Sequence, residues 1–214
     1  GRPGTGVNAL RGQNNVQGAC DMGCLPVVFT GYQKVIDEAA HKKFADAWKF
    51  PDGIAEGKNG YEVTVMMNVL TDNPGELKCM YIMGENPMIS DPDLNHVEEA
   101  LKNLEFLVVQ DIFMNETGEL ADVILPSCCY AEKDGTQTNT ERRVQMWRKA
   151  QDPPGEAKLD WQIIADIAKA MGYGEPFAWN SAEETFNEMA ALTPSYAGMD
   201  YTRLNRPETL HWPC

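Results

Sequence analysis

The stretch that decides the fold runs from Leu77 to Gln110 and reads LKCMYIMGENPMISDPDLNHVEEALKNLEFLVVQ. Two short apolar runs, 77–83 and 105–110, stand at its ends. Between them, apolar side chains recur at helical spacing, at Leu94, Val97, Leu101 and Leu104. A strand, a helix and a second strand at this length predict a βαβ unit with parallel strands and a right-handed connection.

A third apolar run, 122–126, follows after a turn and predicts another strand of the same sheet. The three runs are almost continuously apolar, which is typical of strands covered on both faces. The sequence therefore predicts an α/β fold, with an open, mainly parallel sheet, helices on both faces and a smaller α-rich C-terminal segment. Periodicity and capping residues predict further helices over 37–48, 62–70, 160–171 and 182–192.

Composition limits the partners. The chain has 214 residues, of which 43% are apolar, enough for one large domain or two small ones. Its 18 basic and 32 acidic residues give a net charge of -14, which repels nucleic acid and anionic lipid. No apolar run approaches the roughly 20 residues that a membrane span requires. We expect neither nucleic-acid binding nor membrane insertion.

The six cysteines do not show metal-ligand spacing. One pair has C-x3-C spacing, a second pair is adjacent and two cysteines stand alone, at Cys20, Cys24, Cys128, Cys129, Cys79 and Cys214. The three histidines are far apart in the sequence. We therefore predict no metal site from these residues. Unpaired thiols are typical of a reducing compartment and favour the cytoplasm.

Polar residues flank the predicted strands. In an open parallel sheet, ligands bind in the crevice at the carboxyl ends of the strands. The candidates are Gly84, Asn86 and Ser90 after the first strand, Gln110 and Asp111 after the second, and Asp122 before the third. The alternative is structural, because serine and aspartate also cap helices and start turns. Neither a G-x-G-x-x-G nor a P-loop motif is present.

Two polar segments carry arginines. The stretch GVNALRGQNNVQGACDMG, from Gly6 to Gly23, sets Arg11 among glycines and side-chain amides. The pair Arg142 and Arg143 follows a predicted turn at 134–135. Such a pair suits an anion, although in a polar loop it is more often solvated or salt-bridged.

Five motifs together resemble one family. LRGQNNVQGACDMG, MYIMGENPMISDPD, VVQDIFMNETGELADVILP, EKDGTQTNTERRVQ and the final WPC resemble, in this order, the catalytic (alpha) subunit of molybdenum- or tungsten-dependent formate dehydrogenases. These enzymes are molybdopterin oxidoreductases. The amide run after the arginine distinguishes the formate branch from the related nitrate reductases. The resemblance extends from Gly6 to Cys214.

The resemblance implies a parent enzyme that oxidises formate to CO2, or the reverse, at a metal held by two molybdopterin guanine dinucleotides. Electrons leave through an iron-sulfur cluster. Arg11 is then the residue that holds the formate carboxylate, with Gln13 beside it. The residues around the predicted strands hold the guanosine end of one dinucleotide, and Thr138, Asn139 and Arg143 lie near the pterin and the cluster.

The resemblance also implies an organisation: an active-site arginine loop over 1–30, an α/β domain for the guanine dinucleotide over 31–127, and a pterin- and cluster-proximal segment with helices over 128–214. The family's iron-sulfur motif, its metal-ligating selenocysteine or cysteine with an adjacent histidine, and its C-terminal β-barrel are not found. The chain thus resembles an interior fragment, which we expect to be inactive in isolation.

Formate dehydrogenases of this kind work with an iron-sulfur electron-transfer subunit or a hydrogenase-type partner. Two other interpretations stay open. One is a sister enzyme of the same family, either a nitrate reductase or the related subunit of an NADH-quinone oxidoreductase. The other is a non-catalytic domain that only binds a nucleotide or docks a partner.

Overall fold

The computed structural model describes residues 7, 10, 12–50 and 57–214. The chain divides into two compact units. The first comprises Gly1–Gly60, Asp134–Arg148 and Glu175–Cys214, and the second Tyr61–Lys133 and Lys149–Gly174. These boundaries differ from the predicted ranges 1–30, 31–127 and 128–214. Because those ranges were assigned by what each segment binds, the domain assignment stays a prediction.

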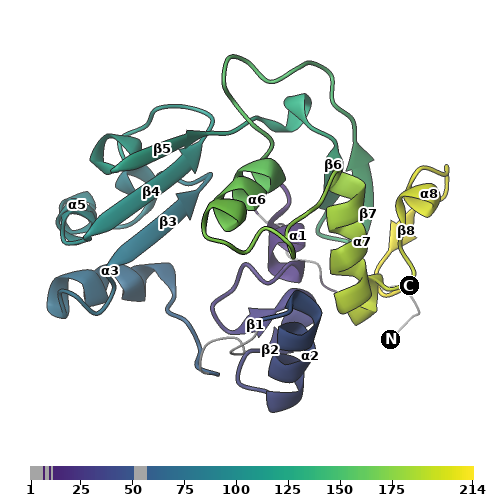
Figure 1. Ribbon diagram of the computed structural model, residues 1–214, viewed down its shortest axis with the longest axis horizontal. Coiled ribbons are helices and arrows are strands. Elements are labelled where there is room, and N and C mark those ends of the chain that lie inside the picture. Colours follow the sequence, from purple (N-terminus) through teal and green to yellow (C-terminus); the bar gives the residue numbers. More distant parts are fainter. Residues whose placement is uncertain (1–6, 8–9, 11, 51–56) are drawn as a thin grey trace. The chain divides into compact units, whose positions relative to one another are not determined.

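The second unit contains the predicted parallel sheet (Figure 1). Its strands are β3 (Cys79–Met83), β4 (Phe106–Asp111) and β5 (Val123–Pro126), in the order β3-β4-β5. Both pairings are parallel, with Ile82 opposite Val109 and Val109 opposite Ile124. The α/β fold and the parallel βαβ unit are therefore confirmed.

Helices α3 (Val63–Asp72) and α5 (Leu94–Lys102) pack together in this unit. The predicted stripe of α5 places Val97 and Leu101 in the core. Alternate residues of β3 and β4 join them, so that the buried core consists of Met67, Leu70, Ile82, Val97, Ala100, Leu101, Leu107 and Val109. The remaining helices of the unit are α4 (Pro87–Ser90) and α6 (Asp160–Ala170).

The expected coverage of the strands on both faces is wrong for β3 in the described part of this unit. Its alternate residues Tyr81 and Met83 are 42% and 48% exposed. Successive side chains of a strand point to opposite faces, so the residues between them enter the core while these do not. An apolar run in the sequence indicates only that burial of the strand is favourable. It does not identify which segment of the chain covers each face of that strand.

The first unit contains α1 (Val16–Asp21) and α2 (Glu38–Trp48). Asp37 caps α2 by accepting hydrogen bonds from the N–H groups of Ala39 and Ala40 at 2.9 and 3.0 Å, which confirms the helix predicted there. Between the two helices, the two-residue strands β1 (Val28–Phe29) and β2 (Gln33–Lys34) flank the 3-10 turn η1 (Thr30–Tyr32).

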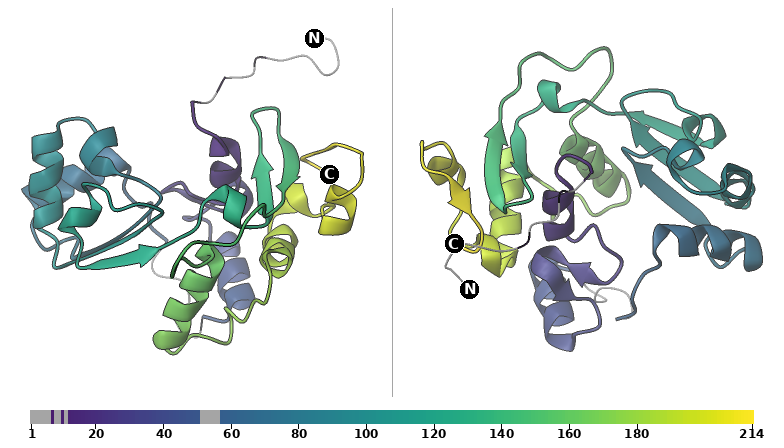
Figure 2. Two further views of the ribbon diagram at one scale, coloured as in Figure 1. Left: turned by 90° about the horizontal axis from the view of Figure 1, so that it is seen from above. Right: turned by 180° about the vertical axis from the view of Figure 1, so that it is seen from behind.

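The same unit holds an antiparallel sheet that the sequence analysis missed (Figure 2). It consists of β6 (Gly135–Thr138), β7 (Arg143–Trp147) and β8 (Leu210–His211). The segment after residue 127 is thus not simply α-rich, although α7 (Ala182–Leu192) lies where it was predicted and is followed by η4 (Pro194–Tyr196) and α8 (Tyr201–Leu204). The polar sequence of β6, GTQT, gives no apolar alternation that would reveal a strand.

Candidate functional site

The carboxyl edge of the parallel sheet begins at Gly84, directly after β3. Its φ of 67° lies in the left-handed region that favours glycine, and its N–H donates to the Gln110 carbonyl at 2.9 Å. A Cβ atom at this position meets nothing within 4 Å. Gly84 therefore turns the chain at the strand end and leaves the space above it open.

Asn86 connects the loops that follow β3 and β4. Its Oδ1 accepts from the Thr117 hydroxyl at 2.7 Å, and its Nδ2 donates to Glu116 at 2.8 Å. Thr117 is fully buried and its hydroxyl also accepts from the Met88 N–H at 3.1 Å. The hydrogen bond from Asn86 lowers the pKa of Glu116 and so favours its carboxylate at this edge.

Sequence reasoning missed Glu116 and Thr117. The signal was present, because the segment NETGE follows the carboxyl end of the second strand. Ser90 is the last residue of α4 rather than the cap of the next helix, and its exposed hydroxyl donates to Asp91 at 3.2 Å. Asp93 is the residue that caps α5.

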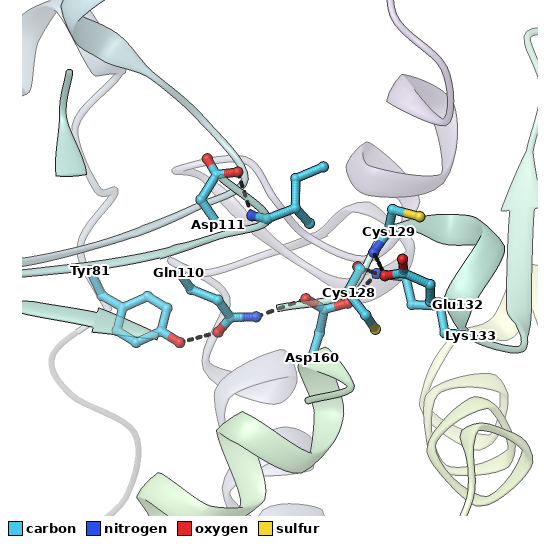
Figure 3. Close-up of polar contacts among 9 residues, drawn as sticks. Tyr81, Gln110, Asp111, Cys128, Cys129, Glu132, Lys133 and Asp160 are labelled. Atoms are coloured by element: carbon cyan, nitrogen blue, oxygen red, sulfur yellow. Dashed lines mark hydrogen bonds and ion pairs between the residues drawn. The ribbon is translucent and has the colours of Figure 1, made fainter. Parts of the chain in front are cut away.

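Gln110, the penultimate residue of β4, lies inside a network rather than at an open edge (Figure 3). It is fully buried, its Nε2 donates to Asp160 at 2.7 Å, and its Oε1 accepts from the Tyr81 hydroxyl. Asp160 in turn pairs with the Lys133 ammonium. Burial first, then the charge of Asp160, raises the pKa of Tyr81. Both ends of the Gln110 carboxamide thus have partners within the protein.

Asp111 is half-buried and its carboxylate shapes the next turn. One oxygen accepts from the Ile112 N–H at 2.6 Å (Figure 3). The other accepts from the Asn115 side chain at 2.9 Å. Each carboxylate oxygen has a further lone pair. Asp111 can therefore hold this turn and still accept a hydrogen bond from a ligand.

The chain after β5 forms the compact turn η3 (Tyr130–Glu132). The Cys129 N–H donates to Glu132 at 2.9 Å, which lowers the pKa of Glu132, and the Lys133 ammonium donates to the Cys128 carbonyl at 3.2 Å (Figure 3). Burial raises the pKa of the Cys128 thiol. Across the described ranges, no three His, Cys, Asp or Glu side chains are grouped so that they could hold a metal ion.

Asp122 lies at the opposite edge of the sheet from the other candidates. Its N–H and carboxylate pair with the backbone of Leu107, at 2.9 and 2.8 Å, where β4 begins. A rise of about 3.3 Å per residue puts this pair roughly 13 Å from Asp111 along the strand. A residue that introduces a parallel strand necessarily lies at the amino edge, so the structure does not bring Asp122 to the crevice.

The first unit contains a polar cavity of about 190 Å³. It brings together three predicted residues, Gln13, Thr138 and Asn139, from segments more than 120 positions apart. Among the described residues, the lining is Gln13, Asn14, Asn15, Val16, Gln17, Gln137, Thr138, Asn139 and Thr140. Arg11 lies outside the residues that the structure describes.

The lining has both fixed and free groups. Asn15 accepts from the Thr138 N–H at 2.9 Å, and Asn139 accepts from the Arg143 N–H at 3.0 Å, where it shapes the β6–β7 turn. The side chains of Gln13, Asn14 and Gln137 have no hydrogen-bond partner within the described chain. Arg143 does not line the cavity, and its Nε lies 3.6 Å from Glu141.

None of the described helices is long and apolar enough to cross a membrane. Residues 1–170 match the family model described as molybdopterin oxidoreductase. The F420-dependent formate dehydrogenase subunit alpha of Methanocaldococcus jannaschii is 56% identical over the whole chain, which covers 30% of that protein. Formate dehydrogenase H of Escherichia coli is 43% identical, with the chain covering 29% of it.

A nitrate-reducing relative is similar as well. The assimilatory nitrate reductase catalytic subunit of Bacillus subtilis is 39% identical over the whole chain and 30% of its own length. The chain therefore spans less than a third of each of these relatives. Among solved structures, acetylene hydratase from Pelobacter acetylenicus superposes with a TM-score of 0.57 over 70% of this chain and 20% of that one. At 24% identity, this similarity supports the fold alone.

Proposed function

The chain belongs to the molybdopterin oxidoreductase family, and from this premise we propose that it forms part of the catalytic subunit of a formate dehydrogenase. The parent protein oxidises formate to CO2, or carries out the reverse reaction. The formate dehydrogenase relatives are more similar to the chain than the nitrate reductase subunit is, which supports the formate branch.

The observation that carries this proposal is the amide-lined cavity of the first unit. A pterin presents alternating donors and acceptors along its edge, and a carboxamide offers both kinds of group. The free side chains of Gln13, Asn14 and Gln137 meet that requirement, and none of the lining residues that the structure describes is charged. The polar edge of the pterin in molybdopterin therefore matches this cavity, with residues 13–17 and 137–140 each supplying one wall.

The carboxyl edge of the parallel sheet fits the guanosine end of a molybdopterin guanine dinucleotide. Glu116 and Asp111 offer acceptors to a guanine or to ribose hydroxyls, and Ser90 adds an exposed hydroxyl. The segments over 84–93 and 111–119 contain six acidic residues and neither lysine nor arginine. The edge therefore suits a neutral nucleoside, whereas its carboxylates repel phosphate groups.

When bound, the molybdenum or tungsten centre of the cofactor supplies the two-electron redox chemistry. Arg11 binds the formate carboxylate through its planar guanidinium, with hydrogen bonds worth about 1.5–3 kcal/mol each. Gln13 lies two residues along and orients the bound carboxylate. Formate loses two electrons and a proton to become CO2, and Arg11 releases this product because it is uncharged.

The proposal includes an electron path through an iron-sulfur cluster to an iron-sulfur subunit or a hydrogenase-type partner. It also includes the cytoplasm as the compartment. The cytoplasm follows from the sequence alone, because cysteines without pairing patterns are typical of a reducing compartment.

The test uses the parent polypeptide that contains this segment, with viologen dyes as electron acceptor or donor. We expect formate oxidation, and Arg11→Lys should lower kcat/KM for formate at least 100-fold because lysine cannot form the paired contact. Arg142→Lys is the matched control, since Arg142 stacks on Trp212 with its guanidinium 5.0 Å from the ring centre. It should change turnover less than threefold.

Nitrate reduction without formate oxidation would identify the sister enzyme instead. A parent protein that holds neither molybdenum nor tungsten would identify a non-catalytic domain. The isolated chain should not reduce the dye with formate. Dye reduction by the isolated chain would contradict the proposal that it supplies only part of the active site.

A further inference from the structure

A buried carboxylate lies behind the amide-lined cavity. Asp21, the last residue of α1, is 1% exposed. Its Oδ1 accepts from Gln17 Nε2 at 2.8 Å and from the Tyr32 hydroxyl at 2.9 Å, and its Oδ2 accepts from the Tyr196 hydroxyl at 2.7 Å. No lysine or arginine pairs with it in the described part of the chain. A buried charge held by neutral donors alone requires all of those donors to be in place.

The directions of these bonds follow from the proton count. A carboxylate only accepts, so the single hydroxyl proton of Tyr196 is directed at Asp21. The Thr138 hydroxyl, 2.7 Å from the Tyr196 oxygen, must then be the donor in that contact. In the same way Tyr32 donates to Asp21 and accepts from Gln17 Nε2 at 2.9 Å.

The raised pKa values of Tyr32 and Tyr196 agree with their role as hydrogen-bond donors to Asp21. Burial, followed by the hydrogen bond and the charge of Asp21, raises the pKa of Tyr32 to about 12. Burial, with a contribution from Asp21, also raises the pKa of Tyr196 well above its usual range. Both hydroxyls therefore keep their protons, as donors to a carboxylate must.

The network reaches two walls of the cavity that come from different elements. Gln17, on α1, lines the cavity and bonds Asp21 directly. Thr138, on β6, lines the cavity and bonds Asp21 through Tyr196. Figure 2 shows α1 beside the β6–β7 hairpin, and the contact between Asn15 and the Thr138 N–H joins the same two elements.

We propose that Asp21 is a positioning residue, whose carboxylate fixes Gln17 and Thr138 relative to each other and thereby sets the width of the cavity. The ligand assigned to the cavity rests on the proposed function, but the positioning role does not. Asparagine has the size of aspartate but replaces one acceptor oxygen with an NH2 donor, so Asp21→Asn leaves one of the three donors facing another donor.

The first measurement is the affinity of the chain for pterin. Binding is monitored through the change in the fluorescence of pterin itself. Asp21→Asn and Tyr196→Phe should each weaken binding at least tenfold, and the double variant should lose little more than either alone. Tyr201→Phe is the matched control, because Tyr201 is also buried, at 7% exposed against 1% for Tyr196, in the same core cluster and its hydroxyl bonds no member of the network. It should change affinity less than twofold.

The second measurement does not depend on the ligand. Hydrogen exchange should accelerate at least tenfold in peptides covering 12–22 and 136–143 of Asp21→Asn and Tyr196→Phe, but not in a peptide covering 38–48 or in Tyr201→Phe. Uniform acceleration, or none, overturns the positioning role. If wild-type chain fails to bind pterin while the selective acceleration occurs, the ligand assignment fails and the positioning role stands.

Discussion

Replacement of Gln110 by glutamate tests whether this residue serves the interior of the second unit rather than a ligand. In the wild-type chain Gln110 Nε2 donates to Asp160 at 2.7 Å. Glutamate has the same size but puts an oxygen in place of the donor, so two carboxylates meet in a fully buried position. The variant can then either keep both charges or bind a proton between them.

The loss of stability has an upper limit set by two alternative routes, one in which both carboxylates stay charged and one in which a proton binds. Two unit charges about 4 Å apart repel by about 4 kcal/mol at an effective dielectric constant of about 20. Protonation at pH 7 of a glutamate with an unfolded pKa of about 4.3 costs about 3.7 kcal/mol, at 1.36 kcal/mol per pH unit. The cheaper route sets the limit, and the Lys133 ammonium beside Asp160 relieves part of the repulsion. We expect a loss of roughly 2–4 kcal/mol at pH 7.

The sign of the pH dependence follows. The folded state raises the pKa of the new glutamate, so the variant has its full stability below about pH 4.3 and loses it as the pH rises through the folded pKa. Hydrogen exchange of β4 amides at pH 4.5 and 7.0 measures this loss, with Asn187→Asp as control because that exposed position gains the same charge. Equal stability losses for the two variants at pH 7, or a loss that does not depend on pH, would refute the reasoning.

Substitutions at three further positions test other parts of the structure. Gly84→Ala should lower the free energy of unfolding by about 1 kcal/mol, because alanine is strained at the positive φ of this position and meets no other atom. Gly84→Asn should lower it by less, because asparagine tolerates this conformation. Equal losses for the two variants in urea unfolding of the second unit would contradict this reasoning. Thr117→Val should cost about 1–3 kcal/mol and accelerate hydrogen exchange in α4, because the Met88 N–H loses its acceptor and Asn86 Oδ1 keeps only the longer bond from the backbone N–H of residue 117, at 3.3 Å; unchanged exchange there would argue against the contact. Phe44→Ala should cost about 3–5 kcal/mol in thermal unfolding of the first unit, because it removes a fully buried ring. The centre of this ring lies 4.5 Å from that of Phe29 and 4.9 Å from that of Trp48. A loss below about 1 kcal/mol would show that the cluster of these three rings is loosely packed.

Much of the second unit was predictable because its signals are local. Apolar runs and a helical stripe lie within 34 consecutive residues, and the parallel pairing of β3 with β4 follows from their connection. The capped helix α2 and the helix α7 were predictable for the same reason. The hairpin of β6 and β7 was not, because β6 is polar and gains its hydrogen bonds from β7.

The candidate site was predictable only in part. The residues around the strands of the sheet were identified by position, yet the prediction could not separate Gln110, whose carboxamide is used inside the protein, from Asp111, which can still accept. Both residues follow the same apolar run. Burial and hydrogen-bond partners decide the difference, and these depend on Tyr81 and Asp160, 29 and 50 positions away.

The sequence by itself determined the family, the α/β class and most helix and strand positions, because motifs and periodicity depend on neighbouring residues. Only the tertiary structure decided that β3 has an exposed face and that Gln13 meets Thr138 at a shared cavity. It also decided that Asp21 meets Tyr196, a residue 175 positions away. Such contacts form when distant segments pack to bury apolar surface, and no local pattern records which segments will meet.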